Sequence, residues 1–353
     1  GPAPTFLRDS ALTKQYPLGR PQRIRVLPDG SAVLFLRTPP REPSLSLYEF
    51  DVASGTTRTL LTPADYAYML NDSRARALVV SGALLPSFEP VLAGMKHLKH
   101  VIVSGDGTTP RPPHALDFDA LLANADDAFE AAETTRDDVC FWLYSSGSTG
   151  APKGTMHVHS SMITTAYLHG GPVVDVRESD VLFSAAKLFF AYGLGNALTY
   201  TLAFGATTVL MAERPTPEAV FRRLKEHRPT IFYGVPTLFA MIMASPALPA
   251  RDEVAIRLCT SAGEALPEHV GKRFSAHFGV DILDGLGSTE MLHVYLSNRP
   301  GDVRYGTSGR PVPGYRLRVV DDEGRAVAPG EVGELQVNGP TSAQGYWNNR
   351  EKS

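Results

Sequence analysis

Five short apolar runs limit what this chain can fold into more than any other feature. They lie between residues 180 and 287 and read DVLFSAA, TTVLM, TIFYGV, IRLCTSAG and VDILDGLG. Most of them are followed by a helical stretch. Apolar runs of this length that alternate with helices are typical of strands buried on both faces of a parallel sheet. We therefore expect an α/β fold in which layered parallel sheets are flanked by helices.

The two ends of the chain have a different pattern. Residues 1–62 contain short runs rich in β-branched and aromatic residues, separated by the turn signals PDG and ASG. They predict a small antiparallel β meander of about four strands. Residues 303–353 contain the hairpin signals DDEG and APGEVG, which predict a β-rich, barrel-like segment. We expect three parts: the meander over 1–62, an α/β core over 63–302 and the β segment over 303–353.

Residues 63–136 predict two helices, each followed by an apolar strand. The helices are PADYAYMLNDSRA and PSFEPVLAGMKHL, and the strands are ALVVSG and HVIVSG. Residues 106–136 are polar and rich in Pro, Asp and Ala. They predict a long surface connection that contains one short helix.

The composition excludes several classes of protein. The formal charge of −3 argues against a general binder of nucleic acid or of anionic membranes, and no run approaches the roughly 20 apolar residues of a membrane span. The N-terminus has no signal-peptide pattern. The two cysteines, Cys140 and Cys259, are too few for a disulfide framework. A reduced, cytoplasmic setting is the expectation.

The stretch YSSGSTGAPKG, residues 144–154, combines glycines, hydroxyl side chains and one lysine directly after an apolar run. We expect a loop between a strand and a helix, with backbone N–H groups and the helix N-terminus directed at an anion. Its spacing differs from the Walker pattern. A flexible surface loop is the alternative. The side chains that could donate to phosphate oxygens are Ser145, Ser146, Ser148, Thr149 and Lys153.

This loop resembles the phosphate-binding signature of adenylate-forming enzymes, which include acyl- and aryl-CoA ligases, luciferases and nonribosomal adenylation domains. Three further stretches follow in the order of that family. SAGEALP (261–267) resembles the adenine-pocket segment, and DGLGSTE (284–290) resembles the motif that meets the α-phosphate and magnesium. YGTSGRPVPG and GELQVNGPTSAQGYWN resemble the later β segments. The resemblance implies the fold of the large N-terminal domain of these enzymes.

The resemblance also implies roles for single residues. Thr149 and Lys153 would contact the β- and γ-phosphates of ATP, Thr289 the α-phosphate, and Glu290 would bind Mg²⁺. Thr289, Glu290 and Lys153 would therefore be catalytic. A solvated surface acid is the alternative for Glu290. The expected ATP-binding residues are Ser145, Ser146, Gly147, Ser148, Thr149, Gly150, Lys153, Gly263, Glu264, Ala265, Asp284, Gly285 and Thr289.

The stretch KLFFAYGLGN, residues 187–196, occupies the place of a family motif that often reads Pro-Leu-Phe-His-x-x-Gly. Together with DGLGSTEMLHVYLSN it resembles the benzoate-CoA ligase branch. The resemblance implies an aryl acid as substrate, with coenzyme A as co-substrate. Plain core packing is the alternative for the aromatic residues, and an ordinary buried histidine is the alternative for His293. The expected aryl-acid residues are Phe190, Ala191, Tyr192, Gly193, Leu286, Gly287, Ser288 and His293.

Two other patterns carry no site. His157 and His159 are two residues apart, which on a helix places them on different faces, and no carboxylate is close in sequence. We therefore expect no zinc site there. No Gly-x-Ser-x-Gly elbow occurs in the sequence, so a serine peptidase is not expected.

The chain also departs from the family pattern. The sequence as given reaches GYWNNREKS, whereas members of the resembled family continue into a ribose-binding aspartate, a hinge and a mobile C-terminal domain with a catalytic lysine. Residues 5–60 resemble a β-propeller blade of prolyl-oligopeptidase-type peptidases, so a fusion is one interpretation. The alternatives to benzoate activation are an inactive fragment that binds ATP and aryl acid, or a ligase for 4-hydroxybenzoate, aminobenzoate or another acid. Whether the chain forms a homodimer stays open.

Overall fold

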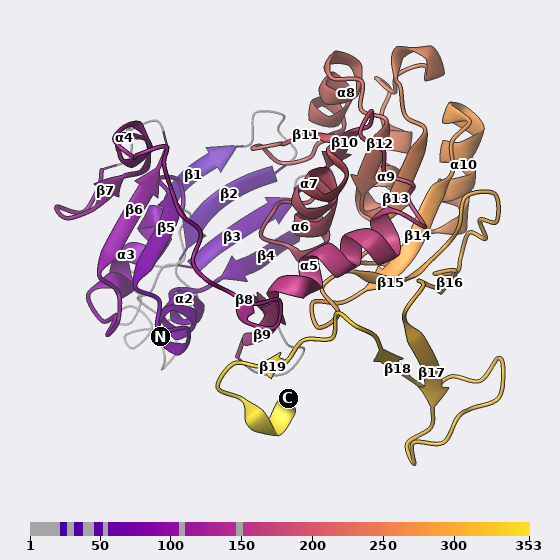
Figure 1. Cartoon of the computed structure of the whole chain (residues 1–353). Coiled ribbons are helices and arrows are strands. Elements are labelled where there is room, and N and C mark those ends of the chain that lie inside the picture. Colours follow the sequence, from indigo (N-terminus) through magenta and orange to yellow (C-terminus); the bar gives the residue numbers. More distant parts are fainter. Residues whose placement is uncertain (1–21, 27–31, 38–45, 52–55, 106–109, 146–150) are drawn as a thin grey trace, which may run out of the picture. The chain divides into compact units, whose positions relative to one another are not determined.

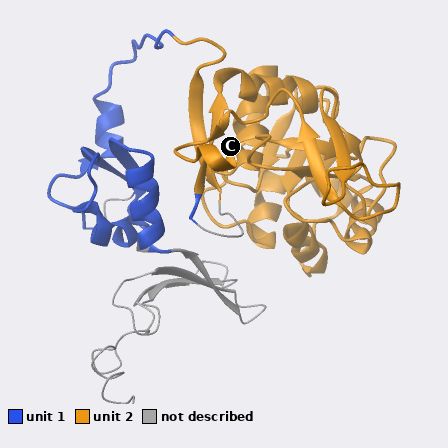
Figure 2. Ribbon diagram, turned by 90° about the horizontal axis from the view of Figure 1, so that it is seen from below, with its two compact units in different colours: residues 1–133, 146–152 blue, residues 134–145, 153–353 orange. Residues whose placement is uncertain are grey.

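The computed structural model describes residues 22–26, 32–37, 46–51, 56–105, 110–145 and 151–353 (Figure 1). The chain forms two compact units, one of residues 1–133 and 146–152 and the other of residues 134–145 and 153–353 (Figure 2). The finer division at residues 62 and 302 stays a prediction. In the part of the chain that is described, no helix combines the length and the apolar character needed to cross a membrane.

The N-terminal strands form the antiparallel meander that the sequence predicts. The strands follow one another in the order β1-β2-β3-β4, and each pairs with its neighbour in the chain. Their bounds are β1 Gln22–Val26, β2 Ala32–Arg37, β3 Ser46–Asp51 and β4 Thr56–Leu61.

The rest of the first unit is a small parallel sheet with short helices. Thr62 caps the first helix by a reciprocal capping box with Asp65. The sheet has the order β5-β6-β7, and its core consists of Val80, Leu85 and Val103. The elements are α2 Pro63–Asp72, β5 Ala77–Ser81, α3 Leu85–Leu92, β6 His100–Ser104, β7 Leu116–Asp117 and α4 Phe118–Ala123.

The second unit is built on a seven-stranded sheet in the order β11-β10-β12-β13-β14-β15-β16. The first five strands in this order are parallel, and they are the five apolar runs of the sequence. The last two strands are antiparallel. The bounds are β10 Val181–Ser184, β11 Thr207–Val209, β12 Ile231–Gly234, β13 Leu258–Ser261, β14 Ile282–Gly287, β15 Val294–Ser297 and β16 Arg310–Pro311.

Helices cover both faces of this sheet. Phe232 of β12 packs among residues of α8, α9 and α10, whereas its neighbours Ile231 and Tyr233 pack on the opposite face with η1 and α7. Successive strand side chains point to opposite faces, so a strand covered on both sides is expected to be mostly apolar. The helices are α5 His159–Thr165, η1 Ala166–Gly170, α6 Ala191–Leu194, η2 Gly195–Thr199, α7 Tyr200–Phe204, α8 Pro217–Glu226, α9 Pro236–Ala244, η3 Arg251–Glu253, α10 Glu268–Phe278 and η4 Arg350–Lys352.

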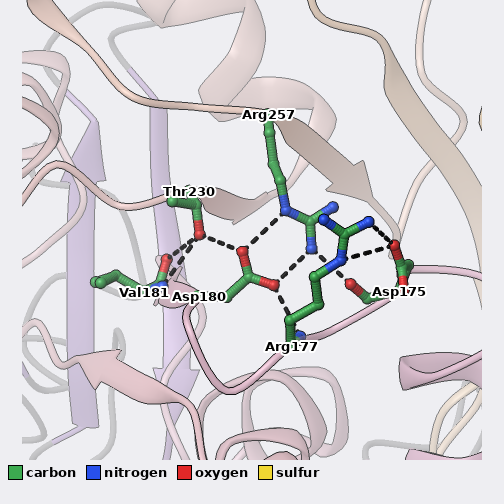
Figure 3. A network of polar contacts seen from close by, with 6 residues as sticks. All are labelled: Asp175, Arg177, Asp180, Val181, Thr230 and Arg257. Atoms are coloured by element: carbon green, nitrogen blue, oxygen red, sulfur yellow. Dashed lines mark hydrogen bonds and ion pairs between the residues drawn. The ribbon is translucent and has the colours of Figure 1, made fainter.

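A network of polar contacts lies at the amino ends of three neighbouring parallel strands (Figure 3). Asp180, Thr230 and Arg257 each directly precede a strand, namely β10, β12 and β13. The Thr230 hydroxyl donates to Asp180 Oδ1 at 2.7 Å, and Arg257 donates to both carboxylate oxygens at 2.9 and 2.6 Å. The Arg177 amide adds a further bond to Asp180 Oδ2 at 2.9 Å. The buried carboxylate is therefore fully satisfied.

The remaining strands form two smaller sheets. β17 (Arg316–Val320) and β18 (Glu334–Asn338) form the hairpin that the sequence predicts. β8 (Val139–Ser145), β9 (Lys153–Val158) and β19 (Gly345–Tyr346) form a sheet in the order β19-β9-β8. The prediction that the glycine-rich loop leads into a helix is therefore wrong. The loop leads into β9, because residues 153–158 pair with β8 on one side and with the distant β19 on the other.

Candidate functional site

The β8–β9 hairpin positions the ends of the glycine-rich loop. Ser145 is the last residue of β8 and stands opposite Lys153, the first residue of β9. The loop residues predicted to bind phosphate, Ser146, Gly147, Ser148, Thr149 and Gly150, lie outside the described residues. Gly154 allows close packing of the hairpin, since a Cβ there would lie 2.8 Å from the Trp142 ring.

Lys153 and Glu290 meet at Tyr346. The Lys153 Nζ lies 4.6 Å from the centroid of the Tyr346 ring, a cation–π distance. The Tyr346 hydroxyl donates to Glu290 Oε1 at 2.8 Å. Burial and this bond to the carboxylate raise the pKa of Tyr346 to about 12, so the hydroxyl keeps its proton. Tyr346 therefore connects the predicted phosphate-binding lysine to the predicted metal-binding glutamate.

The backbone of Thr289 and Glu290 is held from two sides. The ring of His157 on β9 lies with Nε2 2.7 Å from the Thr289 carbonyl oxygen. Because burial lowers the pKa of His157, the neutral ring donates through Nε2–H. The Ala343 amide donates to the Glu290 carbonyl oxygen at 2.8 Å. His157 thus supports the backbone of the GSTE turn. That it is not a zinc ligand stays a prediction.

The predicted adenine side lies at the carboxyl ends of β13 and β14. Asp284 is 2% exposed; its Oδ2 accepts from the Leu266 amide at 3.3 Å, and its Oδ1 has no hydrogen-bond partner among the described residues. Burial raises the pKa of Asp284 to about 6. Gly263 has φ +97°, and a Cβ added to it would have no atom within 4 Å. Glu264 is exposed and accepts from the Thr237 hydroxyl at 3.1 Å.

Ala265 and Gly285 complete this side. Ala265 is exposed, directly after Glu264, in the turn that follows β13. Gly285 is buried within β14, where a Cβ would lie 2.8 Å from the Leu296 carbonyl oxygen. Close pairing of β14 with β15 therefore requires glycine at this position.

The predicted aryl-acid residues come from two segments. In the first, the Tyr192 hydroxyl hydrogen-bonds to Thr260 Oγ1 at 2.6 Å, and the Tyr192 ring stacks on His293 with centroids 5.7 Å apart. A Cβ on Gly193 would lie 2.1 Å from the Lys187 carbonyl oxygen, so only glycine fits there. Phe190 is 56% exposed; it lies directly before Ala191, the first residue of α6.

In the second segment, Leu286 is partly exposed and Ser288 Oγ accepts from the Met291 amide at 3.3 Å. A Cβ on Gly287 would lie 2.7 Å from the His293 carbonyl oxygen. The structure therefore brings Tyr192 and His293 together, while Phe190 and Leu286 keep much of their surface exposed.

Five residues of this region were missed by sequence reasoning. Tyr346 lies within a motif that the sequence singled out, but only the pairing of β19 with β9 brings it to Lys153. Asn196 is the last residue of the stretch KLFFAYGLGN. As an amide among apolar residues it is the only one of the five whose sequence context could have indicated a buried polar cluster. The others carry no local signal. The missed residues are His157, His169, Asn196, Tyr200 and Tyr346.

Comparison with known proteins gives consistent matches. A model of the family described as AMP-binding enzyme matches residues 45–347. Benzoate–CoA ligase from Thauera aromatica is 61% identical over 296 residues, which are 84% of this chain and 55% of that protein. The structures of a benzoate CoA ligase from Burkholderia xenovorans LB400 match with a TM-score of 0.76 and 56% identity, over 84% of this chain and 58% of that one.

A third match is the anthranilate CoA ligase AuaEII in complex with anthranoyl-AMP. Its TM-score is 0.79 and its identity 41%, over 84% of this chain and 57% of that one. The chain therefore spans little more than half the length of the relatives it matches. These matches confirm the predicted α/β fold class and the predicted family. The chain belongs to the AMP-binding family of adenylate-forming enzymes.

Proposed function

We propose that this chain is the ATP- and acid-binding part of an AMP-forming acid–thiol ligase for an aromatic carboxylic acid of the benzoate type. The reaction joins the acid to AMP and then passes the acyl group to coenzyme A. The observation that carries the proposal is that one short segment, residues 287–293, presents Glu290 to the Tyr346–Lys153 pair and His293 to Tyr192. This short segment thus contacts both the charged groups proposed to bind phosphate and the aromatic rings proposed to bind the aryl acid.

The charged groups suit the first half of the reaction. An acid oxygen attacks the α-phosphorus of ATP, the bond to pyrophosphate breaks, and pyrophosphate leaves with the electron pair. Two anions must approach each other, so donors fixed at the developing charge lower the barrier. In this proposal Lys153, the loop hydroxyls up to Thr149 and the Thr289 side chain supply those donors. Tyr346 keeps Lys153 and Glu290 at the same place.

A Mg²⁺ ion fits the donor chemistry of Glu290. Mg²⁺ is commonly held by one or two carboxylates, together with water and substrate phosphate oxygens. The described residues contain no group of three or more His, Cys, Asp or Glu side chains that could hold a metal. When bound with ATP, the ion would neutralise phosphate charge.

The adenine end would lie beside the carboxyl ends of β13 and β14. Gly263, Glu264, Ala265, Asp284 and Gly285 are the proposed nucleotide-binding residues there. The buried Asp284 oxygen without a partner and the open space at Gly263 support this assignment. Ligands of open α/β sheets bind at the carboxyl ends of the strands.

The proposed acid-binding side chains suit an uncharged aromatic ring. Tyr192 and His293 stack, and burial lowers the pKa of His293 to about 4, so its ring is neutral. The relatives named above act on benzoate and hold anthranoyl-AMP, which supports an aryl acid for this chain as well. The proposed acid-binding residues are Phe190, Ala191, Tyr192, Gly193, Leu286, Gly287, Ser288 and His293.

Calorimetry on the chain as it stands tests the binding half of the proposal. Benzoate and Mg·ATP are titrated separately and together, with octanoate as the matched control. We expect binding of benzoate and ATP and none of octanoate. Binding of octanoate in place of benzoate would contradict the aryl-acid assignment.

Turnover needs a second measurement. Benzoate-dependent pyrophosphate exchange is followed for the chain alone and for a version extended with the C-terminal domain of the family. We expect exchange by the extended version. Binding without exchange in either form would favour the second candidate function, an inactive protein that binds ATP and aryl acid. The cytoplasmic location and the homodimer stay predictions.

A further inference from the structure

A continuous chain of hydrogen bonds surrounds His293 inside the second unit. His169 Nδ1 lies 2.8 Å from the Tyr200 hydroxyl, which lies 2.9 Å from His293 Nδ1. His293 Nε2 lies 3.2 Å from Asn196 Oδ1. All four side chains are at most 3% exposed. Water therefore has little access to these four side chains, so each hydrogen-bond donor must be matched by an acceptor within the group.

The two partners of the His293 ring together favour one proton arrangement. The Asn196 amide oxygen lies at Nε2 and accepts, and the Tyr200 hydroxyl lies at Nδ1 and can donate, so the two contacts together place the hydrogen on Nε2. In a neutral His293 the Nδ1 atom is then an acceptor, and the Tyr200 hydroxyl donates to it. The Tyr200 oxygen in turn accepts from His169, which must be protonated at Nδ1.

Packing holds the His293 ring in a single place. A Cβ on Gly195 would lie 2.3 Å from His293 Cδ2, so the ring lies directly on the helix backbone. The Tyr192 ring stacks on it with an interplanar angle of 27°. The side chains therefore fix both the orientation of the ring and the atom that carries its proton.

No carboxylate takes part in this chain of hydrogen bonds among the described residues. Burial lowers the pKa of His293 to about 4, and burial together with His293 and Arg299 lowers the pKa of His169 well below its ordinary value. Both rings stay neutral at physiological pH. The other titratable groups that interact electrostatically with Tyr200 are Tyr192, Tyr233 and Tyr315.

We infer that Tyr200 and His169 are positioning residues of the aryl-acid site, which hold His293 as the neutral Nε2–H tautomer with its ring against Tyr192. The part of the inference that concerns aryl-acid binding rests on the proposed function. The part that concerns the tautomer of His293 does not. The inference has a consequence for specificity. A neutral His293 supplies no positive charge, so in the proposed site the acid carboxylate is neutralised only at the phosphate end, and a second carboxylate on the ring would find no cation at His293.

The experiment compares Tyr200→Phe with Tyr233→Phe. The Tyr233 ring centroid lies 6.5 Å from that of Tyr200; the side chain is fully buried, and its hydroxyl has no partner in the described part of the chain. Both variants lose one buried hydroxyl, but only the first loses the bonds to histidine. The ring nitrogens of ¹⁵N-histidine-labelled protein are measured by NMR between pH 5.5 and 8, with His293 assigned through His293→Gln. Benzoate affinity is measured by calorimetry.

We expect wild-type His293 to be neutral and protonated at Nε2 over the whole range. Tyr200→Phe should give a mixture of tautomers and weaken benzoate binding about five- to tenfold, whereas Tyr233→Phe should change neither. A wild-type His293 protonated at Nδ1, or charged at pH 7, would overturn the inference, and this readout depends on neither tyrosine variant. An unchanged tautomer and affinity in Tyr200→Phe would also overturn it. Absence of benzoate binding by the wild type would instead remove the proposed function, and the wild-type spectrum would still decide the tautomer.

Discussion

The two ends of the central parallel strands of the second unit differ in how their polar groups are satisfied. At the amino ends, Asp180 receives hydrogen bonds from Arg257, Thr230 and the Arg177 amide (Figure 3). At the carboxyl ends, Ser261 Oγ and Asp284 Oδ1 are buried without a hydrogen-bond partner among the described residues. Both ends bury a carboxylate. Both oxygens of Asp180 accept hydrogen bonds, whereas in Asp284 only Oδ2 does so among the described residues.

The difference also appears in the pKa values of the two aspartates. Burial alone would raise the pKa of Asp180, but its hydrogen bonds to Arg257 and Thr230 lower it below the ordinary value. Burial raises the pKa of Asp284 to about 6. Unsatisfied buried groups cost stability and are retained where a ligand can use them. The amino ends therefore stabilise the fold, and the carboxyl ends are the side at which ligands would bind.

The largest expected effect on stability is at the amino ends. Arg257→Ala leaves a buried carboxylate without its main partner and should lower the free energy of unfolding by about 3 kcal/mol, measured by urea denaturation. Arg177→Ala is the control, because its ion pair with Asp175 is exposed and contributes little. Equal losses in the two variants would show that the network is not a buried support.

The next effect concerns rate and not stability. Lys153→Gln in the extended protein should slow benzoate-dependent pyrophosphate exchange about 100-fold, because it removes a positive charge that would stabilise the negatively charged transition state. Its free energy of unfolding should change little. Lys272→Gln removes an exposed lysine that pairs with Glu268 and is the control. A loss of stability that matches the loss of rate would assign Lys153 to the fold.

Asp284→Asn tests the cost of the unsatisfied carboxylate. The folded pKa of about 6 lies above the ordinary 3.8, so the native state binds the proton first and wild-type stability falls as pH rises from about 4 to 6. Asparagine removes this dependence and should stabilise the protein at pH 7 by on the order of 2 kcal/mol. Chemical denaturation at pH 4 and pH 7 measures it. A variant less stable than the wild type at pH 7 would contradict the assignment.

The smallest effect is expected from Tyr346→Phe. The ring stays in place for Lys153, but the hydrogen bond to Glu290 is lost, so exchange should slow about fivefold. Tyr346→Leu removes the ring as well and should slow it further. Equal rates for the two variants would mean that the ring does not hold Lys153.

The sequence predicted the parts of the fold that depend on local pattern. The strands β10 to β14 can be predicted from their apolar runs, because burial on both faces favours apolar residues. The sequence did not predict β9, since KGTMHV mixes polar and apolar residues and becomes a strand by pairing with β8 across the glycine-rich loop and with β19, which is far away in the sequence. Glu290 and His293 lie in recognisable motifs. Tyr200 and His169 lie within ordinary helical stretches, and only the packing of η1 and α7 brings them together.

The most direct test compares Asp180→Asn with Asp284→Asn by thermal unfolding, with and without Mg·ATP and benzoate. A ligand that binds the native state raises Tm. If the amino ends stabilise and the carboxyl ends bind, Asp180→Asn lowers Tm and keeps the ligand-induced rise, whereas Asp284→Asn keeps or raises Tm and loses much of that rise. A full ligand-induced rise in Asp284→Asn, together with its loss in Asp180→Asn, would contradict the account.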